Sequence, residues 1–467
     1  MARYPEAPPW PTEEYSAAMT INPTKIMMNH NSMTTHHPPS HEISLRTISN
    51  NRAVVGRNMG EQTPYFISVD EALEIAYQTP LPITSEVVEL AQADNRLLAS
   101  DLISPIDDPP FDNSAMDGWA VQYQDTTSAR EEAPVKLEII GTVQAAETST
   151  PPPVVGAGQA MRIMTGAPMP EGADSIIQIE HTTVSKDDKQ VALHFPSKPN
   201  FIRRCGENLV AGQIVFPSGT LLTPERLGLC ATMGFGELKV QSKLKIAIIS
   251  TGDEIIPLGQ ELKPGQIYES NSHGLAALVK WLGHEPTIHP NVADNLNSLR
   301  KALDQAAKSA DIIITSGGVS MGEFDFVRKI MEEEGDVHFW RVKLRPGSPP
   351  LFGTWKDIPL WGLPGNPVSS HVVFRVLTAP WIRRQSKASG PREVKVRVRL
   401  ADPVKAMADG LTLRRIDLEF TPEGLIGRVT THQGSSNLHG LATAAALTLL
   451  PPGSSGAAGE WIDALLL

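Results

Sequence analysis

The sequence is poor in cysteine, in long apolar runs and in basic charge. Its 467 residues include two cysteines, too few for a disulfide framework. No apolar run approaches the roughly 20 residues of a membrane-spanning helix, and the N-terminus lacks the basic and apolar segments of an export signal. Lys and Arg number 41 against 52 Asp and Glu, a net charge of −11 that disfavours nonspecific binding to nucleic acid or anionic membranes. We therefore expect a soluble cytoplasmic protein with several domains.

The first 64 residues differ in composition from the rest of the chain. They are rich in Pro, Met and Asn and contain no aromatic residue after Tyr15. Such a segment buries little apolar surface, so we predict a disordered tail over residues 1–64. Four histidines (His30, His36, His37 and His41) suggest a metal site, but no Cys or carboxylate completes a ligand shell there, and a solvated tail is favoured.

Short elements separated by turns are predicted over residues 66–240. Ser68 and Glu71 have the spacing of a capping box and predict the start of a helix. The polar and apolar stretch 86–100 is expected to pair with that helix. Five β-type runs separated by Gly and Pro follow, and they predict a small antiparallel domain. These runs are 119–121, 135–140, 161–164, 175–180 and 191–195.

The pattern changes at residue 245 to strands that alternate with helices. Apolar runs at 245–250 and 311–315 predict buried strands, and 338–344 is extended. Helical periodicity occupies 274–282, 296–308, 324–334 and 367–382, the last with an expected bend at Pro380. Alternating strands and helices predict a parallel, doubly wound sheet, which binds ligands at the carboxyl ends of its strands. After residue 390, the alternation over 394–400 predicts a small C-terminal β domain.

Candidate ligand-binding residues follow the two buried strands. The first strand leads into Ser-Thr-Gly-Asp-Glu at 250–254 and the second into Ser-Gly-Gly-Val-Ser at 316–320. Glycine-rich turns before helices favour phosphate. Carboxylates beside phosphate imply a divalent cation between them. Any one of these acids could instead cap a helix, but four at two strand ends favour a ligand site. The four are Asp253, Glu254, Glu323 and Asp325.

Two further segments suggest anion binding. Arg341, Lys343 and Arg345 alternate, so an extended chain directs all three to one side. A solvated edge strand protected by charge is the alternative interpretation. At 363–367, Leu-Pro-Gly-Asn-Pro predicts a helix start with Asn366 as N-cap and Pro367 in the first turn, and exposed N–H groups there would form a second anion pocket.

A serine hydrolase is a rival interpretation of the same region. Residues 318–322 match G-x-S-x-G, with Ser320 as the nucleophile and Asp336 and His371 following in order. A nucleophile elbow places the serine directly after the strand, whereas Ser-Gly-Gly intervenes here and indicates a loop. Cys205 and Cys230 lack a CxxC or paired-histidine context and are expected to be ordinary residues.

Five segments, in the expected order, resemble the signatures of the molybdopterin molybdenumtransferases, the family of MoeA and the gephyrin E-domain. They are FDNSAMDGWAV at 111–121, RIMTGAP at 162–168, STGDE at 250–254, SGGVSMGEFD at 316–325 and LPGNPVS at 363–369. The resemblance implies an α/β multidomain fold. An elongated domain (65–105 and 206–240) contains an inserted β domain (106–205), and an αβα molybdopterin-binding domain (241–386) and a C-terminal β-barrel (387–467) follow.

The resemblance also implies an activity and its partners. The reaction would insert molybdate into adenylated molybdopterin with Mg²⁺ assistance, giving molybdenum cofactor and AMP. A homodimer is implied, with each site between the αβα domain of one subunit and the inserted domain of the other. Contacts with the molybdopterin adenylyltransferase and with acceptor molybdoenzymes are implied as well. A receptor-anchoring scaffold and a paralogue for another oxyanion, such as tungstate, remain alternatives.

Individual positions that match the family motifs receive roles from the resemblance. The implied catalytic residues are Asp117, Thr165, Glu254, Asp294 and Asp325, with Glu254 and Asp325 also as metal ligands. Asp117 and Thr165 would act across the dimer. The implied substrate-binding residues are Ser316, Gly317, Gly318, Ser320, Arg341, Arg345, Pro364, Pro367 and Ser435.

The chain also departs from the family pattern at four positions. The family usually has Lys where this chain has Arg341 and Arg345, often Lys at Ser348, and often Asp at Asn208. Arg retains the positive charge but replaces a point charge with a planar fork of donors. These departures concern the molybdate contacts rather than the fold.

Overall fold

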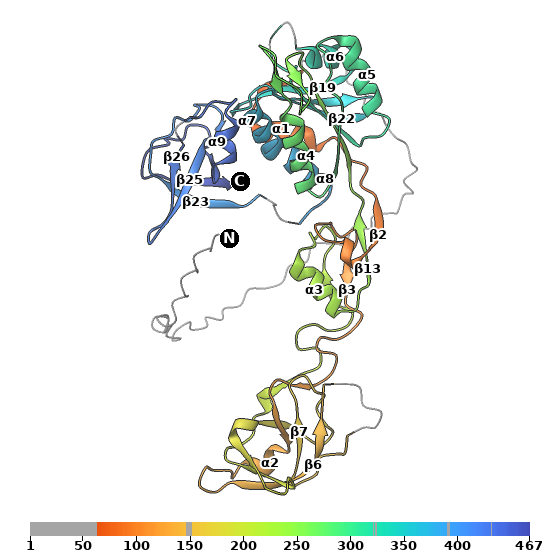
Figure 1. Cartoon of the computed structure of the whole chain (residues 1–467), viewed down its shortest axis with the longest axis vertical. Coiled ribbons are helices and arrows are strands. Elements are labelled where there is room, and N and C mark those ends of the chain that lie inside the picture. The colour runs from red at the N-terminus through yellow and green to blue at the C-terminus, as the bar shows by residue number, and fades with distance from the viewer. Residues whose placement is uncertain (1–62, 146–151, 321, 323–324, 390–392, 431) are drawn as a thin grey trace, which may run out of the picture. The chain divides into compact units, whose positions relative to one another are not determined.

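The computed structural model describes residues 63–145, 152–320, 322, 325–389, 393–430 and 432–467 (Figure 1). The predicted tail, apart from its last two residues, and Glu323 lie outside the described residues. Among the described residues, no helix combines the length and the apolar character needed to cross a bilayer.

A seven-stranded sheet forms the centre of the αβα region, in the order β1-β19-β21-β22-β18-β14-β17. Its strands are β1 (Tyr65–Ile67), β14 (Lys245–Ser250), β17 (Glu285–Ile288), β18 (Ile312–Ser316), β19 (Asp336–Val342), β21 (Leu351–Trp355) and β22 (Ile358–Leu363). Strands β22, β18, β14 and β17 run parallel, as predicted, but β21 is antiparallel to both of its neighbours. The sheet is therefore mixed. Lys356 and Asp357 have φ of 48° and 66°, a left-handed pair that closes the tight β21–β22 hairpin.

Helices cover both faces of this sheet (Figure 1), which confirms the doubly wound class. Ile246 and Ile248 of β14 pack into a core with α1, α4, α7 and α8. Ala247 and Ile249, which point to the opposite face, pack with α5 and α6. Burial on both faces explains why these strands are continuous apolar runs. The helices are α1 (Val69–Tyr77), α4 (Asn271–Trp281), α5 (Leu296–Ala306), α6 (Phe326–Glu334), α7 (Pro367–Val373) and α8 (Ala379–Gln385), with a π-helical turn at Phe374–Thr378 between α7 and α8.

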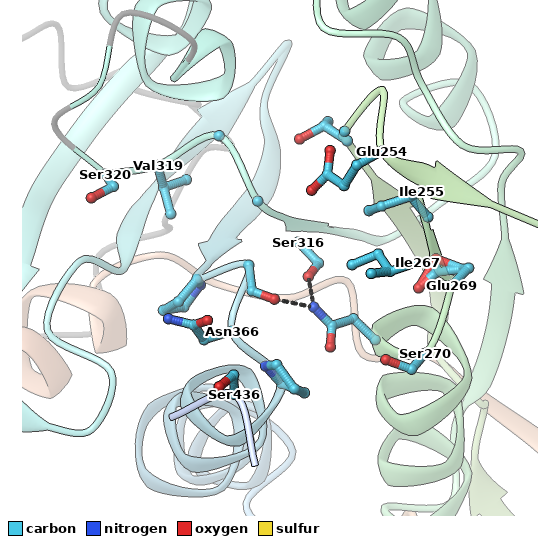
Figure 2. Close-up of a pocket in the computed structure, with 18 of the residues that line it drawn as sticks. Glu254, Ile255, Ile267, Glu269, Ser270, Ser316, Val319, Ser320, Asn366 and Ser436 are labelled. Carbon is cyan, nitrogen blue, oxygen red and sulfur yellow. Dashed lines mark hydrogen bonds between the residues drawn. The ribbon is translucent and has the colours of Figure 1, made fainter. Parts of the chain in front are cut away.

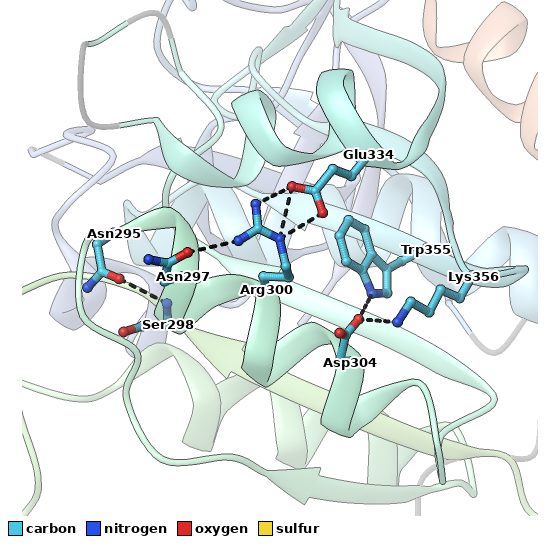
Figure 3. A network of polar contacts seen from close by, with 8 residues as sticks. All are labelled: Asn295, Asn297, Ser298, Arg300, Asp304, Glu334, Trp355 and Lys356. Atoms are coloured by element: carbon cyan, nitrogen blue, oxygen red, sulfur yellow. Dashed lines mark hydrogen bonds and ion pairs between the residues drawn. The ribbon is translucent and has the colours of Figure 1, made fainter.

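Polar contacts hold α5 to α6 and to the β21–β22 hairpin (Figure 3). The Arg300 guanidinium donates to both carboxylate oxygens of Glu334. Asp304 accepts from the Trp355 indole N–H at 3.0 Å and pairs with Lys356 Nζ at 2.7 Å. The Lys356 contact is the main reason why the pKa of Asp304 is lowered. On the face of the sheet covered by α5 and α6, called the outer side below, ion pairs and hydrogen bonds therefore add to the apolar packing.

The region around the predicted N-terminal helix is partly as expected. Ser68 caps α1 with a complete capping box. The prediction that 86–100 pairs with α1 is wrong, because its first part forms strand β2 (Ser85–Glu89), which pairs antiparallel with β13 (Glu237–Gln241). A small core around Leu98, Cys230 and Leu238 holds these segments together. Strands β3 (Leu102–Ile103) and β12 (Ile214–Phe216) pair beside it, with helix α3 (Pro224–Thr232).

All five predicted β runs between 119 and 195 lie in one six-stranded sheet, in the order β8-β5-β7-β6-β10-β9. Its strands are β5 (Gly118–Val121), β6 (Val135–Val143), β7 (Gln159–Ile163), β8 (Ser175–Gln178), β9 (Thr182–Val184) and β10 (Gln190–Leu193). Strands β6 and β7 are parallel, so the sheet is not wholly antiparallel as predicted. Strands β4 (Asn113–Ser114) and β11 (Ile202–Arg203) pair separately, and α2 (Tyr123–Thr126) follows β5.

The C-terminal region is a closed barrel, as expected. Its strands are β23 (Lys395–Leu400), β25 (Arg415–Thr421), β26 (Gly424–Val429), β27 (Ala446–Leu449) and β28 (Trp461–Leu466). Val398 and Leu400 of the alternating segment lie in the barrel core. Short elements lie nearby: β15 (Ile255–Ile256), β16 (Ile267–Tyr268), β20 (Leu344–Arg345), β24 (Leu411–Thr412) and α9 (Leu438–Ala442). The residue boundaries between domains stay a prediction.

Candidate active site

A cavity of about 670 Å³ lies at the carboxyl ends of β14, β18 and β22, where a doubly wound sheet binds its ligand. The loops after all three strands line it, together with Ser436 from the C-terminal region. In Figure 2, Glu254 and Ser320 lie on opposite sides of the cavity, with Ser316 between them. Ser316, Gly317, Gly318 and Ser320, four of the predicted substrate-binding residues, all line this cavity.

The Ser-Gly-Gly loop adopts a conformation that requires its glycines. Gly317 and Gly318 have φ of 98° and 70°, in the region that residues with a Cβ rarely adopt. A Cβ on Gly317 would also lie 2.9 Å from Thr251 Oγ1. The Gly317 N–H donates to the Leu363 carbonyl at 3.0 Å, which joins the ends of β18 and β22. The two strand-end loops are therefore fixed against each other.

Asn271, in the first turn of α4, is a site residue that the sequence analysis missed. Its Nδ2 donates to Ser316 Oγ at 2.8 Å and to the Gly365 carbonyl at 2.6 Å, the two dashed contacts in Figure 2. Its Oδ1 is buried and has no hydrogen-bond partner among the described residues. A buried acceptor without a partner is uncommon in folded proteins, and this one belongs to a residue that lines the cavity. No sequence motif marks Asn271, and only the fold brings it to Ser316.

The predicted acids gather at the same cavity. Glu254, Asp294 and Asp325 line it, and Asp253 Oδ1 accepts from the Asp294 N–H at 3.1 Å. Burial is the main cause that raises the pKa of Asp294. The negative charge of Asp253 raises it further, followed by those of Glu254 and Asp325. Burial and the charges of three neighbouring carboxylates therefore disfavour the ionised form of Asp294.

These acids do not form a closed protein cage for a metal. Within the described part of the chain, no group of three or more His, Cys, Asp or Glu is placed to hold an ion. Magnesium in phosphate-binding sites is usually held by one or two carboxylates, substrate oxygens and water. The concentrated negative charge around Asp294 fits that kind of cation, with ligands completed by a substrate.

The Pro-Gly-Asn-Pro turn forms a third wall. Pro364, Asn366 and Pro367 line the cavity, and the Ser370 hydroxyl donates to the Pro364 carbonyl. Ser435 contacts this turn through its main chain, because its carbonyl accepts from the Val368 N–H at 3.1 Å. Ser436 lines the cavity and Ser435 does not.

The predicted row of three cations does not form one anion site. Arg341 has a φ of 65°, and its Nη1 donates to the Tyr65 hydroxyl at 2.8 Å. Its guanidinium lies over the ring of Phe66, as does Lys343 Nζ, which also pairs with Asp409 at 3.7 Å. Neither Arg341 nor Arg345 lines the cavity.

Arg345 instead acts on Arg414 through its charge. Burial first, and then the charge of Arg345, lowers the pKa of the Arg414 guanidinium. Neither arginine makes an ion pair with the acids that the structure describes. The neighbouring Arg415 donates to the His432 carbonyl at 2.6 Å and to the Gly434 carbonyl at 3.2 Å, so it holds the loop that carries Ser436. Nothing in the sequence pattern indicated Arg414, which follows Arg345 by 69 positions and lies directly before β25.

The hydrolase alternative is not supported by the geometry. No histidine lines the cavity among the described residues. The proposed base His371 packs against Gly274, where an added Cβ would lie 2.5 Å from His371 Nε2. The proposed acid Asp336 pairs with His338 at 3.3 Å. Ser320 therefore lacks both partners of a triad.

Comparison with known proteins decides the family. Residues 67–234 match the MoeA N-terminal region (domains I and II), and residues 247–384 match a probable molybdopterin-binding domain. The molybdopterin molybdenumtransferase of Haemophilus influenzae is 38% identical over 330 residues, which cover 70% of this chain and 79% of that protein. The chain belongs to the molybdopterin molybdenumtransferase family, a family of transferase enzymes.

Other members of the molybdopterin molybdenumtransferase family extend the match. The Bacillus subtilis protein of that name is 32% identical over 413 residues, covering 87% of this chain and 95% of its own. Among solved structures, the molybdopterin biosynthesis MoeA protein of Pyrococcus horikoshii OT3 has a TM-score of 0.75 at 28% identity, and the match covers 86% of this chain and all of that chain. The fold is therefore that of the family as well.

Two of the residues implied by the family pattern lie in the six-stranded sheet region, away from the cavity walls. The Thr165 N–H and hydroxyl both donate to Asp117 Oδ1, at 2.7 and 2.8 Å. The backbone hydrogen bond is the largest cause lowering the pKa of Asp117. Both residues are exposed and neither lines the cavity.

One departure from the family pattern has a local structural reason. Asn208 Nδ2 donates to Asp108 Oδ2 at 3.1 Å, a bond that an aspartate at this position could not donate. The amide thus replaces a repulsive pair of carboxylates with a hydrogen bond.

Proposed function

We propose that this protein inserts molybdate into adenylated molybdopterin, releasing AMP and forming molybdenum cofactor. One observation carries the proposal: a glycine-rich loop, three carboxylates (Glu254, Asp294 and Asp325) and the Pro-Gly-Asn-Pro turn line the same cavity. Molybdopterin carries a phosphate, and its adenylated form carries a diphosphate, so both suit a site of this kind. The family to which the chain belongs supports the same reaction.

The glycine-rich loop and Asn271 would bind and orient the pterin substrate. The loop exposes Gly318 and Ser320 to the cavity, where main-chain N–H groups and a hydroxyl suit phosphate oxygens. Asn271 holds Ser316 of the loop against Gly365 through its two hydrogen bonds. Positioning of this kind supplies much of the catalysis in phosphoryl-transfer reactions.

The carboxylates would act on the diphosphate together with Mg²⁺. Glu254 and Asp325 are the residues that we propose hold the cation, with Asp294 beside them. A bound Mg²⁺ supplies charge neutralisation during cleavage of the diphosphate. Without a cation, these acids would repel the substrate's negative charge. Burial first, and the neighbouring carboxylates second, raise the pKa of Asp294.

Arg345 and Arg414 are proposed to attract molybdate. Two guanidinium groups without acidic partners among the described residues favour an oxyanion, and each presents a planar fork of donors. Arg341 would contribute less directly, because it contacts Tyr65. Ser435 and its neighbour Ser436 would close the cavity from the barrel side.

We further propose that the enzyme is a cytoplasmic homodimer, and that Asp117 and Thr165 complete the site of the other subunit. Both are exposed and hydrogen-bonded to each other, yet neither lines the cavity of its own chain. The adenylyltransferase that makes the substrate and the acceptor molybdoenzymes are proposed partners. An analytical ultracentrifugation measurement showing only monomers would contradict this arrangement.

The test is AMP release from adenylated molybdopterin with Mg²⁺, in molybdate and separately in tungstate. We expect release that depends on molybdate, and a loss of at least about 100-fold in Asp325→Asn, as for removal of a transition-state contact. Asp304→Asn is the matched control, because Asp304 lies on the outer side of the sheet and pairs with Lys356. No release from folded wild-type protein with either oxyanion would reject the transferase proposal. Full activity in Asp325→Asn would reject the role of that residue alone.

A further inference from the structure

The tip of the glycine-rich loop is held from outside the cavity by Trp340. The Trp340 indole N–H donates to the Val319 carbonyl at 3.0 Å. The indole is itself fixed, because the Arg328 guanidinium lies 4.0 Å from its ring centroid and the Tyr65 ring lies 5.2 Å away. Its main-chain N–H donates to the Pro64 carbonyl at 3.0 Å. Trp340 therefore joins the loop to β1 and α6.

This contact determines which way the next peptide group faces. In a trans peptide, the carbonyl and the N–H of the following residue point in opposite directions. Trp340 does not line the cavity, whereas Val319 and Ser320 do, and Figure 2 shows both at one side of it. A Val319 carbonyl that faces Trp340 thus directs the Ser320 N–H away from Trp340 and toward the cavity.

The rest of the loop is fixed by equally specific contacts. The Arg328 N–H donates to the Gly318 carbonyl at 3.1 Å, and Asn271 donates to the Ser316 hydroxyl. The Val319 side chain is buried, and its Cγ1 would lie 2.7 Å from a Cβ on Gly362. With side chain and neighbouring carbonyl both fixed, rotation of the peptide between Val319 and Ser320 is opposed mainly by the indole hydrogen bond.

We infer that Trp340 is a positioning residue, whose indole N–H orients the Ser320 main-chain N–H as a donor to a phosphate oxygen of the substrate. The inference rests on the proposed function for the identity of that substrate. It adds a residue that touches neither the cavity nor any predicted ligand. It also explains why an indole is useful here, since a phenyl ring could keep the stacking but not the hydrogen bond.

Trp340→Phe tests the inference, with Trp355→Phe as the matched control. The control also removes an indole N–H in the same sheet, but its acceptor is Asp304 on the outer side. Molybdopterin binding to the full chain would be measured by isothermal titration calorimetry. We expect about tenfold weaker binding for Trp340→Phe, the usual effect of losing a hydrogen bond to a charged group, and a change below about twofold for the control.

Hydrogen–deuterium exchange without any ligand separates this inference from the proposed function. A peptide spanning 316–320 should exchange faster in Trp340→Phe and not in Trp355→Phe. Weaker binding together with faster exchange supports the inference. Unchanged affinity, or weaker binding with unchanged exchange, overturns it. If the wild-type protein does not bind molybdopterin, the proposed function fails. The exchange of this peptide alone then supports or overturns the claim that the Trp340 indole orients the peptide between Val319 and Ser320.

Discussion

His371 should make the stability of the αβα domain depend on pH. The imidazole lies on α7, next to a cavity of about 300 Å³ that Arg375 and Leu438 also line. Burial first, and the positive charge of Arg375 second, lowers its pKa from 6.5 to about 4. On one side the ring packs closely against Gly274, which limits the hydration of a charged ring there. The folded protein therefore keeps His371 neutral where the unfolded chain binds a proton.

The sign and size of the effect follow from that difference. Because the folded pKa is depressed, the stabilisation is complete above pH 6.5 and is lost as the pH falls from 6.5 toward 4. One unit of pKa corresponds to about 1.4 kcal/mol, so the full shift lowers the free energy of unfolding by about 3 kcal/mol once the pH is well below 4. At pH 5 the linkage relation gives a loss of about 2 kcal/mol. These values are upper estimates, because partial solvent access to the ring reduces them.

The assay compares wild type with His371→Gln at pH 7 and pH 5, by denaturant unfolding followed by tryptophan fluorescence of the αβα domain. Carboxylates that titrate in this window do so in both proteins, so the difference between the two pH dependences isolates His371. We expect the variant to lose about 2 kcal/mol less than wild type between the two pH values. His273→Gln on the exposed side of α4 is the control and should behave as wild type. An equal loss in wild type and His371→Gln would refute the reasoning.

Three further outcomes are expected. Asn271→Ala should weaken molybdopterin binding about tenfold or more in calorimetry, because it removes the two hydrogen bonds that join Ser316 of the loop to Gly365 through Asn271; unchanged affinity would contradict this. Gly118→Ala should destabilise the six-stranded sheet region by more than about 2 kcal/mol in a proteolysis assay, since the new Cβ would lie 2.0 Å from the Ile177 carbonyl oxygen, while the αβα domain unfolds as before. Asp294→Asn should bind AMP more tightly than wild type in EDTA and lose that advantage in Mg²⁺, because it removes one repulsive charge; tighter wild-type binding in EDTA would count against the repulsion.

The sequence predicted the fold correctly where the local pattern of residues fitted one kind of secondary structure only. The runs at 245–250 and 311–315 are apolar on both faces, and they form β14 and the greater part of β18. The prediction for residues 86–100 failed because their mixture of charged and apolar residues fits either a helix or a half-exposed strand. The partner strand β13, some 150 positions later, decides between them. No local window contains that information.

The site divides in the same way. Glu254 belongs to the segment that follows one predicted strand, and Asp325 lies at the start of the predicted helix after the other, so topology alone places both at one edge of the sheet. Asn271 and Arg414 come from segments without a motif, and their roles depend on contacts across long sequence separations. The alternation of Arg341, Lys343 and Arg345 predicted that all three side chains point to one side of a strand. The φ of 65° at Arg341 is not that of a regular strand and changes the direction of its side chain. Direction along a strand is predictable only while the strand stays regular.

Under the proposed function, an acidic protein binds an anionic substrate, and we expect three side chains to contribute to this. Asn271, Arg415 and Trp340 each donate to a main-chain carbonyl of a loop at the cavity: Gly365, His432 with Gly434, and Val319. A carbonyl that is engaged away from the cavity leaves the N–H on the opposite side of its peptide facing the other way. The loops can then offer N–H dipoles to a ligand at short range, where a net charge of −11 spread over the surface is screened within about 10 Å. Under the proposed function, we therefore expect replacement of Asn271, Arg415 or Trp340 to weaken phosphate binding, and the Asn271 and Trp340 variants would do so without any change of charge.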